Sequence, residues 1–206
     1  MSMPSSLGIQ EGDLKRVEVS LEQEPHLISE TIVYEKMSPL HIATANGQID
    51  VLSYLLDWNF HLDARSRNKQ TPLMMATMYG NVSCIERLLQ ASANILLFES
   101  LHRRTCLRYV ANYGHTNCLE AILSVVQSTL VVESWGFSRF VNMRDGIRAT
   151  SLHLAARMKH TGVVQMLMRN GILVCATTGA QGRPGMTPLH LVAQGGCLDS
   201  VRELLS

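Results

Sequence analysis

This sequence of 206 residues has few aromatic residues, few charged residues and almost no net charge. Aromatic residues make up 5%, charged residues 17%, and the formal net charge is +1. A balance so close to neutral gives no general electrostatic case for DNA, RNA or an anionic membrane surface, so we expect none of these as a partner. The longest apolar run, near 119–132, is interrupted by polar residues and is too short to span a bilayer, which argues against membrane insertion.

Targeting signals and a disulfide framework are also missing. The N-terminus has no basic segment followed by an apolar stretch, and position 2 is Ser2 rather than the glycine that N-myristoylation requires. The cysteine count is odd and no two cysteines form a C-x-x-C pair. We therefore expect buried, inert thiols in a reducing compartment, cytoplasmic or nuclear. The five are Cys84, Cys106, Cys118, Cys175 and Cys197.

Motifs of catalysis and ligand binding are missing as well. The chain has no H-E-x-x-H, no G-x-S-x-G, no phosphate-binding G-x-x-x-x-G-K-[ST] and no zinc-type Cys/His spacing. We name no catalytic, cofactor-binding or metal-ligating residue and expect no cofactor. An enzyme with its own active site is the least favoured interpretation.

What the chain does contain is one ten-residue phrase that occurs five times. The copies begin at residues 38, 71, 105, 150 and 187, at intervals of 33, 34, 45 and 37 residues. The clearest copies are TPLMMATMYG and TPLHLVAQGG. A period near 33 with a T-P-L-H-x-A core is typical of the ankyrin repeat. The pattern predicts an all-α ankyrin-repeat solenoid of about five repeats, which presents an extended binding surface.

The residues inside the phrase explain the helices that it predicts. Thr187 is a good N-cap and Pro188 suits the first helical position, while Gly195 or Gly196 ends the helix. A second amphipathic helix follows each phrase. We expect a disordered segment at 1–10, a degenerate capping repeat at 11–37, and ankyrin repeats over 38–206. In the fourth copy Lys159 stands where the stop glycine belongs, at a cost of about 1 kcal/mol.

Three histidines share the fourth place of the phrase. They are His41, His153 and His190. Their common register indicates a structural role, in which each imidazole ties the start of one helix to a loop of the neighbouring repeat.

The polar connectors at 63–70 and 99–104 are the first candidate binding elements. In an ankyrin array such connectors form β-turn fingers along one edge. Their candidate residues are Arg67, Lys69, His102 and Arg103. The alternative is that these charges only solvate the loop tips, whereas the functional interpretation is a rim that contacts a partner.

An insertion at about 127–149 is the second candidate. It accounts for the 45-residue interval and concentrates aromatic side chains in a chain that has few. One interpretation is that its aromatics pack against neighbouring helices; the other is a protein-binding patch, because aromatic and Arg residues dominate interface energetics. The candidate residues are Trp135, Phe137, Arg139 and Phe140.

The stretches LHIATANGQIDVLSYLLD, NKQTPLMMATMYG and ESWGFSRFVNMRD resemble the ankyrin region of plant ankyrin-repeat RING ubiquitin ligases. The resemblance covers about residues 11–206. It implies a protein partner, either a ubiquitination substrate or a receptor kinase, and a substrate-recruiting role. A RING domain needs eight Cys/His ligands, which five dispersed cysteines cannot supply, and the sequence stops at Ser206 without a polar cap. We therefore expect a truncated chain that binds rather than catalyses; the alternative is a free-standing ankyrin adaptor with no ubiquitin role.

Overall fold

The computed structural model describes residues 4–23, 36–58, 60–128, 136–179 and 184–205. The chain divides into two compact units, residues 1–100 and residues 101–206. Across these described residues, every element of regular secondary structure is a helix. The predicted all-α fold is confirmed.

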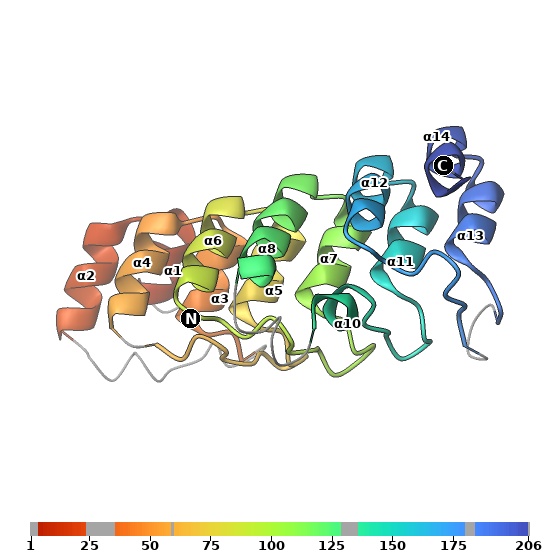
Figure 1. Cartoon of the computed structure of the whole chain (residues 1–206). Helices are drawn as coiled ribbons and strands as arrows, with labels where there is room; N and C mark the ends of the chain where they lie inside the picture. Colours follow the sequence, from red (N-terminus) through yellow and green to blue (C-terminus); the bar gives the residue numbers. More distant parts are fainter. Residues whose placement is uncertain (1–3, 24–35, 59, 129–135, 180–183, 206) are drawn as a thin grey trace. The chain divides into compact units, whose positions relative to one another are not determined.

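The first unit is a stack of three helix pairs (Figure 1). The first helices of the pairs contact one another in sequence order, and the second helices form the other layer. The pairs are α1 (Pro4–Glu11) with α2 (Leu14–Gln23), α3 (Pro39–Ala45) with α4 (Ile49–Asp57), and α5 (Pro72–Tyr79) with α6 (Val82–Gln90). The core lies between the two layers and is built from aliphatic side chains such as Leu40, Leu52 and Ile85, all fully buried.

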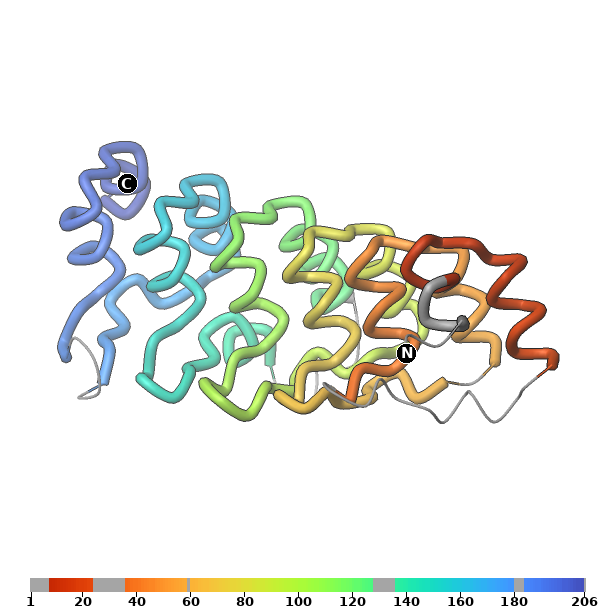
Figure 2. Tube along the Cα trace, turned by 180° about the vertical axis from the view of Figure 1, so that it is seen from behind, coloured from red at the N-terminus to blue at the C-terminus, as the bar shows by residue number. Residues whose placement is uncertain are grey.

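The described residues of the second unit repeat this arrangement and include a short helix outside the pairs (Figure 2). Helices α7, α11 and α13 contact one another in one layer, and α8, α12 and α14 do so in the other. The helices are α7 (Cys106–Tyr113), α8 (Thr116–Ser128), α10 (Phe137–Val141), α11 (Ser151–Met158), α12 (Thr161–Arg169), α13 (Pro188–Gly195) and α14 (Leu198–Leu205). Leu119, Ile122 and Leu152 are fully buried between the layers.

The start and stop residues of the phrase behave as the sequence predicts. Thr71 Oγ1 accepts a hydrogen bond from Met74 N (3.3 Å) at the start of α5. Lys159 takes the left-handed conformation (φ 64°) at the end of α11, where other repeats have glycine. At Gly114 (φ 78°) a Cβ atom would lie 2.5 Å from His160 Nδ1, so a side chain of the following repeat occupies the space.

The N-terminal prediction needs a correction. Residues 4–10 were expected to be disordered, but they lie in α1, which contacts both α2 and α3. Ile9 is buried against these neighbours. The spacing from Pro4 to Gly12 equals that from Pro72 to Gly80, so the phrase was present in a form without its T-P-L-H core. Residues 24–35 of the expected capping repeat lie outside the described residues.

Candidate functional site

Two of the three histidines of the phrase join a helix start to the next finger. His41 Nδ1 accepts from Ser38 N (3.0 Å), and its Nε2 donates to Gln70 O (2.9 Å). His153 forms the same pair of bonds, with Thr150 N (3.2 Å) and Met186 O (3.1 Å). The predicted structural role is confirmed for these two residues.

These bonds specify the neutral imidazole. A backbone N–H must donate to Nδ1, so Nδ1 stays unprotonated while Nε2 carries the hydrogen. Burial, which penalises the charged form, lowers the pKa of both His41 and His153 despite the favourable contacts with Gln70 O and Met186 O. These side chains are therefore fixed parts of the scaffold rather than acid–base groups.

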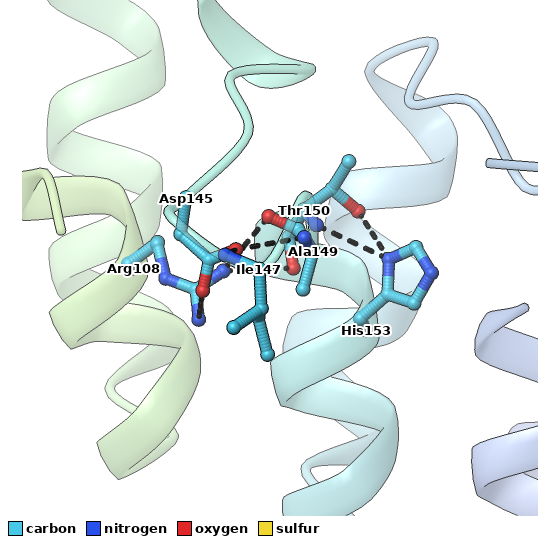
Figure 3. Close-up of polar contacts among 6 residues, drawn as sticks. All are labelled: Arg108, Asp145, Ile147, Ala149, Thr150 and His153. Carbon is cyan, nitrogen blue, oxygen red and sulfur yellow. Dashed lines mark hydrogen bonds and ion pairs between the residues drawn. The ribbon is translucent and has the colours of Figure 1, made fainter. Parts of the chain in front are cut away.

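Arg108 occupies the histidine position in the third copy of the phrase, TCLR. Its guanidinium donates to Ala149 O (3.0 Å) and Thr150 O (3.4 Å), the carbonyls of the next finger (Figure 3). It also pairs with Asp145 (2.8 Å), and the two side chains are only 7% and 4% exposed. The local sequence around Arg108 does not indicate this ion pair, because 37 residues separate its partners.

Both carboxylate oxygens of Asp145 have partners within the protein, at the start of the finger of residues 145–149. Its Oδ1 accepts from Ala149 N (2.7 Å) and from Ile147 N (3.1 Å), and its Oδ2 faces Arg108. A buried carboxylate held by a cation and two backbone donors fixes the loop around it. Residues 145–149 thus form a rigid finger attached to α7.

Each described finger has a left-handed residue two positions before the N-cap of the next helix. Glycine is the residue that adopts this conformation without strain, yet four of the five positions carry a long basic side chain. They are Lys36 (φ 51°), Lys69 (φ 58°), Arg103 (φ 56°), Arg148 (φ 61°) and Gly185 (φ 72°). The tips of the fingers are therefore basic.

The predicted finger residues are all exposed. Arg67 and Lys69 lie in the finger of the first unit, and His102 and Arg103 lie in a finger of the second. Solvent exposure is compatible with a partner-binding rim and with a solvated loop tip alike, so the functional assignment stays a prediction.

The aromatic insertion divides between core and surface. Phe140 is 1% exposed, and its neighbour Val141 is buried with it, so for Phe140 the structure favours the alternative in which the aromatic side chain packs against neighbouring helices. Asn142 Oδ1, directly after α10, accepts from Leu173 N (2.7 Å) and fixes the short helix to the next repeat. Phe137 is half-buried and Arg139 is exposed. Trp135 lies outside the described residues.

Two depressions in the described part of the second unit bring candidate residues such as His102, Arg103 and Arg139 together with residues that the sequence did not point to. We call the first the basic hollow; it has a volume of about 580 Å³. Its lining includes Leu101, Arg104, Arg108, Ile147, Arg157 and Leu191. We call the second the arginine groove; its lining includes Arg103, Arg139, Arg144 and Leu173. The loops 99–104 and 142–150 contribute residues to both: Leu101, Arg104 and Ile147 line the hollow, and Arg103 and Arg144 line the groove.

The near-neutral net charge hides an uneven distribution. Residues 1–100 contain 7 Lys and Arg against 12 Asp and Glu, whereas residues 101–206 contain 11 against 5. The first unit is therefore acidic and the second basic. The basic hollow and the arginine groove both belong to the basic unit.

The cysteines only partly match the expected burial. Burial raises the pKa to about 11 for Cys84 and Cys118 and to about 12 for Cys106, as expected for inert core thiols. Cys175, however, is exposed. Cys197 is partly exposed, and its pKa is lowered mainly by hydrogen bonding with Ser200.

The described residues contain neither a cluster of metal-binding side chains nor a candidate membrane-spanning helix. Within that part of the chain, no three His, Cys, Asp or Glu residues come together as a metal site. Of the helices described, none combines the length and apolar character that crossing a membrane demands.

Comparison with known proteins now places the fold in a family. The family model for ankyrin repeats (three copies) matches residues 6–99 and 126–206. The chain belongs to the ankyrin-repeat family. The human ASB11 ankyrin repeat domain has the same fold, with a TM-score of 0.76 at 20% sequence identity, over 99% of this chain and 83% of that one.

Two plant proteins are much more similar in sequence. E3 ubiquitin-protein ligase XB3 of Oryza sativa subsp. japonica is 55% identical over 174 residues, which are 84% of this chain and 39% of the ligase. XBAT31 of Arabidopsis thaliana is 50% identical over 176 residues, 85% of this chain and 39% of that protein. The chain thus spans about two fifths of the length of these relatives. The expected resemblance is confirmed: this is an ankyrin-repeat protein-interaction module homologous to plant E3 ubiquitin ligases.

Proposed function

We propose that this chain recruits a protein substrate for ubiquitination, as the ankyrin region of a RING-type ubiquitin ligase lineage. The observation that carries the proposal is the 55% identity to rice E3 ubiquitin-protein ligase XB3 over 174 residues. Conserving an ankyrin stack alone does not demand such identity, since the human ASB11 domain keeps the fold at 20%. A receptor kinase is the second partner class that the resemblance implies, and the cytoplasm or nucleus is the proposed location.

The geometry supports a binding role rather than chemistry. His41 and Arg108 each hold the next finger through its backbone carbonyls, so the fingers are fixed before any partner arrives. A rigid surface loses little conformational entropy on binding. The exposed finger residues, including Arg67 and Lys69, then provide contacts on a preformed scaffold.

Competition with the rice ligase tests the proposal. XB3, ubiquitin, its activating and conjugating enzymes and rice leaf extract are combined, with and without an excess of the 206-residue chain. Ubiquitinated peptides are then quantified by mass spectrometry. We expect the chain to lower the ubiquitination of a subset of extract proteins while self-ubiquitination of XB3 stays unchanged, because the chain occupies substrates rather than the catalytic domain.

The human ASB11 ankyrin repeat domain is the matched control, since it shares the fold at low identity. If the chain lowers the modification of no protein beyond that control, the ubiquitin role is wrong. The free-standing adaptor would then be the better description.

A further inference from the structure

The basic hollow lies in a unit with a large excess of positive charge, and its own lining has the same character. Its one carboxylate, Asp145, is already neutralised by Arg108. In the part of the chain that the structure describes, no carboxylate pairs with Arg157. Arg104 Nε is buried and lacks a hydrogen-bond acceptor among the same residues. The hollow therefore offers cationic donors that an acidic ligand would satisfy.

The arginine groove extends this character along the same two loops. Arg139 and Arg144 line it, and no acidic residue is among its described lining residues. Arg144 donates to Thr177 O (3.3 Å), which fixes its side chain in place. A chain segment with several carboxylates would meet arginines in both depressions.

Apolar surface accompanies the charge. Leu101 is 76% exposed at the hollow, Ile147 is partly exposed, and Leu191 is buried below them. A volume of about 580 Å³ lies within the range of known ligand sites, about 300–1,000 Å³. The hollow can accommodate an aliphatic side chain together with the acidic residues that flank it.

The walls are rigid before a ligand binds. The buried Arg108–Asp145 pair fixes the finger of residues 145–149, and the bond from His153 Nε2 holds the backbone at Met186. Preorganised donors lose less entropy on binding than flexible ones do. Rigid walls with uncompensated arginines favour selection of a particular ligand chemistry.

We propose that the basic hollow binds an acidic segment of a partner protein, with an aliphatic residue of that segment seated against Leu101 and Ile147 and carboxylates facing Arg104 and Arg157. The arginine groove takes the next acidic residues of the same segment. The inference rests on the proposed function in that the partner is the recruited protein. It adds the chemical class of the segment that is recognised.

Selection from a phage-displayed library of random short peptides tests the preference directly. The immobilised 206-residue chain should enrich peptides in which Asp or Glu flanks Leu, Ile, Val or Met. A synthetic, fluorescein-labelled copy of the enriched sequence should bind more weakly as salt rises, because added ions screen exposed charges over about 10 Å at 0.1 M. If no sequence is enriched, or if the enriched sequences lack acidic residues, the inference is wrong.

Charge-reversal variants locate the site. Arg157→Glu should weaken binding of the labelled peptide by about tenfold or more, because it replaces attraction by repulsion at the hollow. Arg169→Glu is the matched control: Arg169 is exposed in the last turn of α12, as Arg157 is in the last turn of α11, but it does not line the hollow. It should change the affinity by less than about twofold. Equal losses in both variants would contradict the proposal.

Circular dichroism and a second variant show whether a loss of binding results from misfolding. Circular dichroism should give the same helicity for both variants, and Arg139→Glu probes the arginine groove independently should Arg157→Glu fail to fold.

The experiment also distinguishes two other possible ligands of the basic hollow. A single-stranded oligonucleotide that displaces the peptide and binds more tightly would assign the hollow to nucleic acid, and self-association lost in Arg157→Glu would assign it to a second copy; either result overturns the inference.

The competition assay separates this inference from the proposed function. If Arg157→Glu competes with XB3 as well as the unmodified chain does, the recruiting function stands and the acidic-segment inference fails. If the acidic peptide binds but the unmodified chain does not compete, the reverse holds.

Discussion

One finger of the first unit and one of the second form the same turn with different chemistry. In the first, Ser66 N donates to Gln70 O (3.0 Å) and Ser66 Oγ accepts from Gln70 N (3.1 Å). In the second, Asp145 N donates to Ala149 O (3.0 Å), while a carboxylate oxygen accepts from Ala149 N (2.7 Å). The neutral hydroxyl of Ser66 and the charged carboxylate of Asp145 thus each close the turn by accepting a hydrogen bond from the backbone N–H four residues later.

The side chain that reaches each finger differs in the matching way. His41, a neutral imidazole, donates to the carbonyl of Gln70, and Arg108 donates to the equivalent carbonyl of Ala149. Arg108 is needed where Asp145 is buried, because an unpaired buried carboxylate would be costly. Arg108 and Asp145 therefore function as a pair. The arginine takes the place that His41 has in the first unit, the aspartate takes the place that Ser66 has, and each of these differences requires the other.

The largest expected effect comes from breaking the ionic version. Arg108→Ala leaves Asp145 buried without its cation and should lower the free energy of unfolding by about 3–5 kcal/mol. His41→Ala removes neutral hydrogen bonds and some buried packing but leaves no charge unpaired, and it should cost about 1–3 kcal/mol. Urea denaturation of each variant measures both changes. Equal losses in the two variants would show that leaving the Asp145 carboxylate unpaired adds no further cost in stability.

A double variant sharpens the comparison. Arg108→His with Asp145→Ser installs the first unit's pair in the second unit, and it should recover most of the stability that Arg108→Ala loses, because no buried charge remains unpaired. Urea denaturation gives the recovery. A double variant that is less stable than Arg108→Ala would mean that the histidine geometry does not transfer.

The next effect concerns two stop glycines, Gly114 in the second unit and Gly47 in the first, which differ in how closely a neighbouring side chain approaches them. Gly114→Ala combines a left-handed backbone with a Cβ atom that would lie 2.5 Å from His160 Nδ1, so we expect a loss of about 2–3 kcal/mol. At Gly47 the nearest atom, Asn81 Oδ1, would lie 3.0 Å away, and Gly47→Ala should cost less. Gly171→Ala is the control for backbone strain alone, because nothing lies within 4 Å there. Thermal unfolding that ranks Gly171→Ala as the most harmful would contradict this order.

Lowering the pH should reduce the stability that His41 and His153 contribute, but not the stability that Arg108 contributes. Burial lowers the folded-state pKa of His41 and His153 below the ordinary value of 6.5, so the unfolded chain binds protons first as the pH falls. Their contribution is complete above pH 6.5 and decreases as the pH falls below it. Hydrogen exchange at pH 7.5 and at pH 5.5 should show faster opening of α3 at the lower pH, and His41→Gln should reduce that difference. An unchanged difference would exclude His41 as its source.

The sequence predicted what is encoded locally and missed what depends on distant partners. Thr71 and Pro72 start a helix, and Gly80 ends it, through contacts within a few residues, so the helix pairs were predictable. Arg108 was missed because nothing near TCLR indicates that Asp145 will be buried beside it. The burial of Phe140 was likewise left open, since only packing with other repeats decides it. The opposite net charges of the two units could have been counted from the sequence, but they cancel in the net charge of the whole chain.

The smallest expected effect tests the basic tips of the fingers. Lys69 in the first unit and Arg148 in the second both adopt the left-handed conformation (φ 58° and 61°) that glycine adopts freely. Replacing either by glycine relieves this strain but also frees the unfolded chain, so a net gain of about 0.5 kcal/mol is expected for each. Gly185→Lys makes the opposite change at the equivalent position (φ 72°) and should lose a similar amount. If Lys69→Gly and Arg148→Gly both destabilise the protein, the basic side chains must contribute contacts that outweigh the strain, and the tips would be part of the scaffold rather than a surface available to a partner.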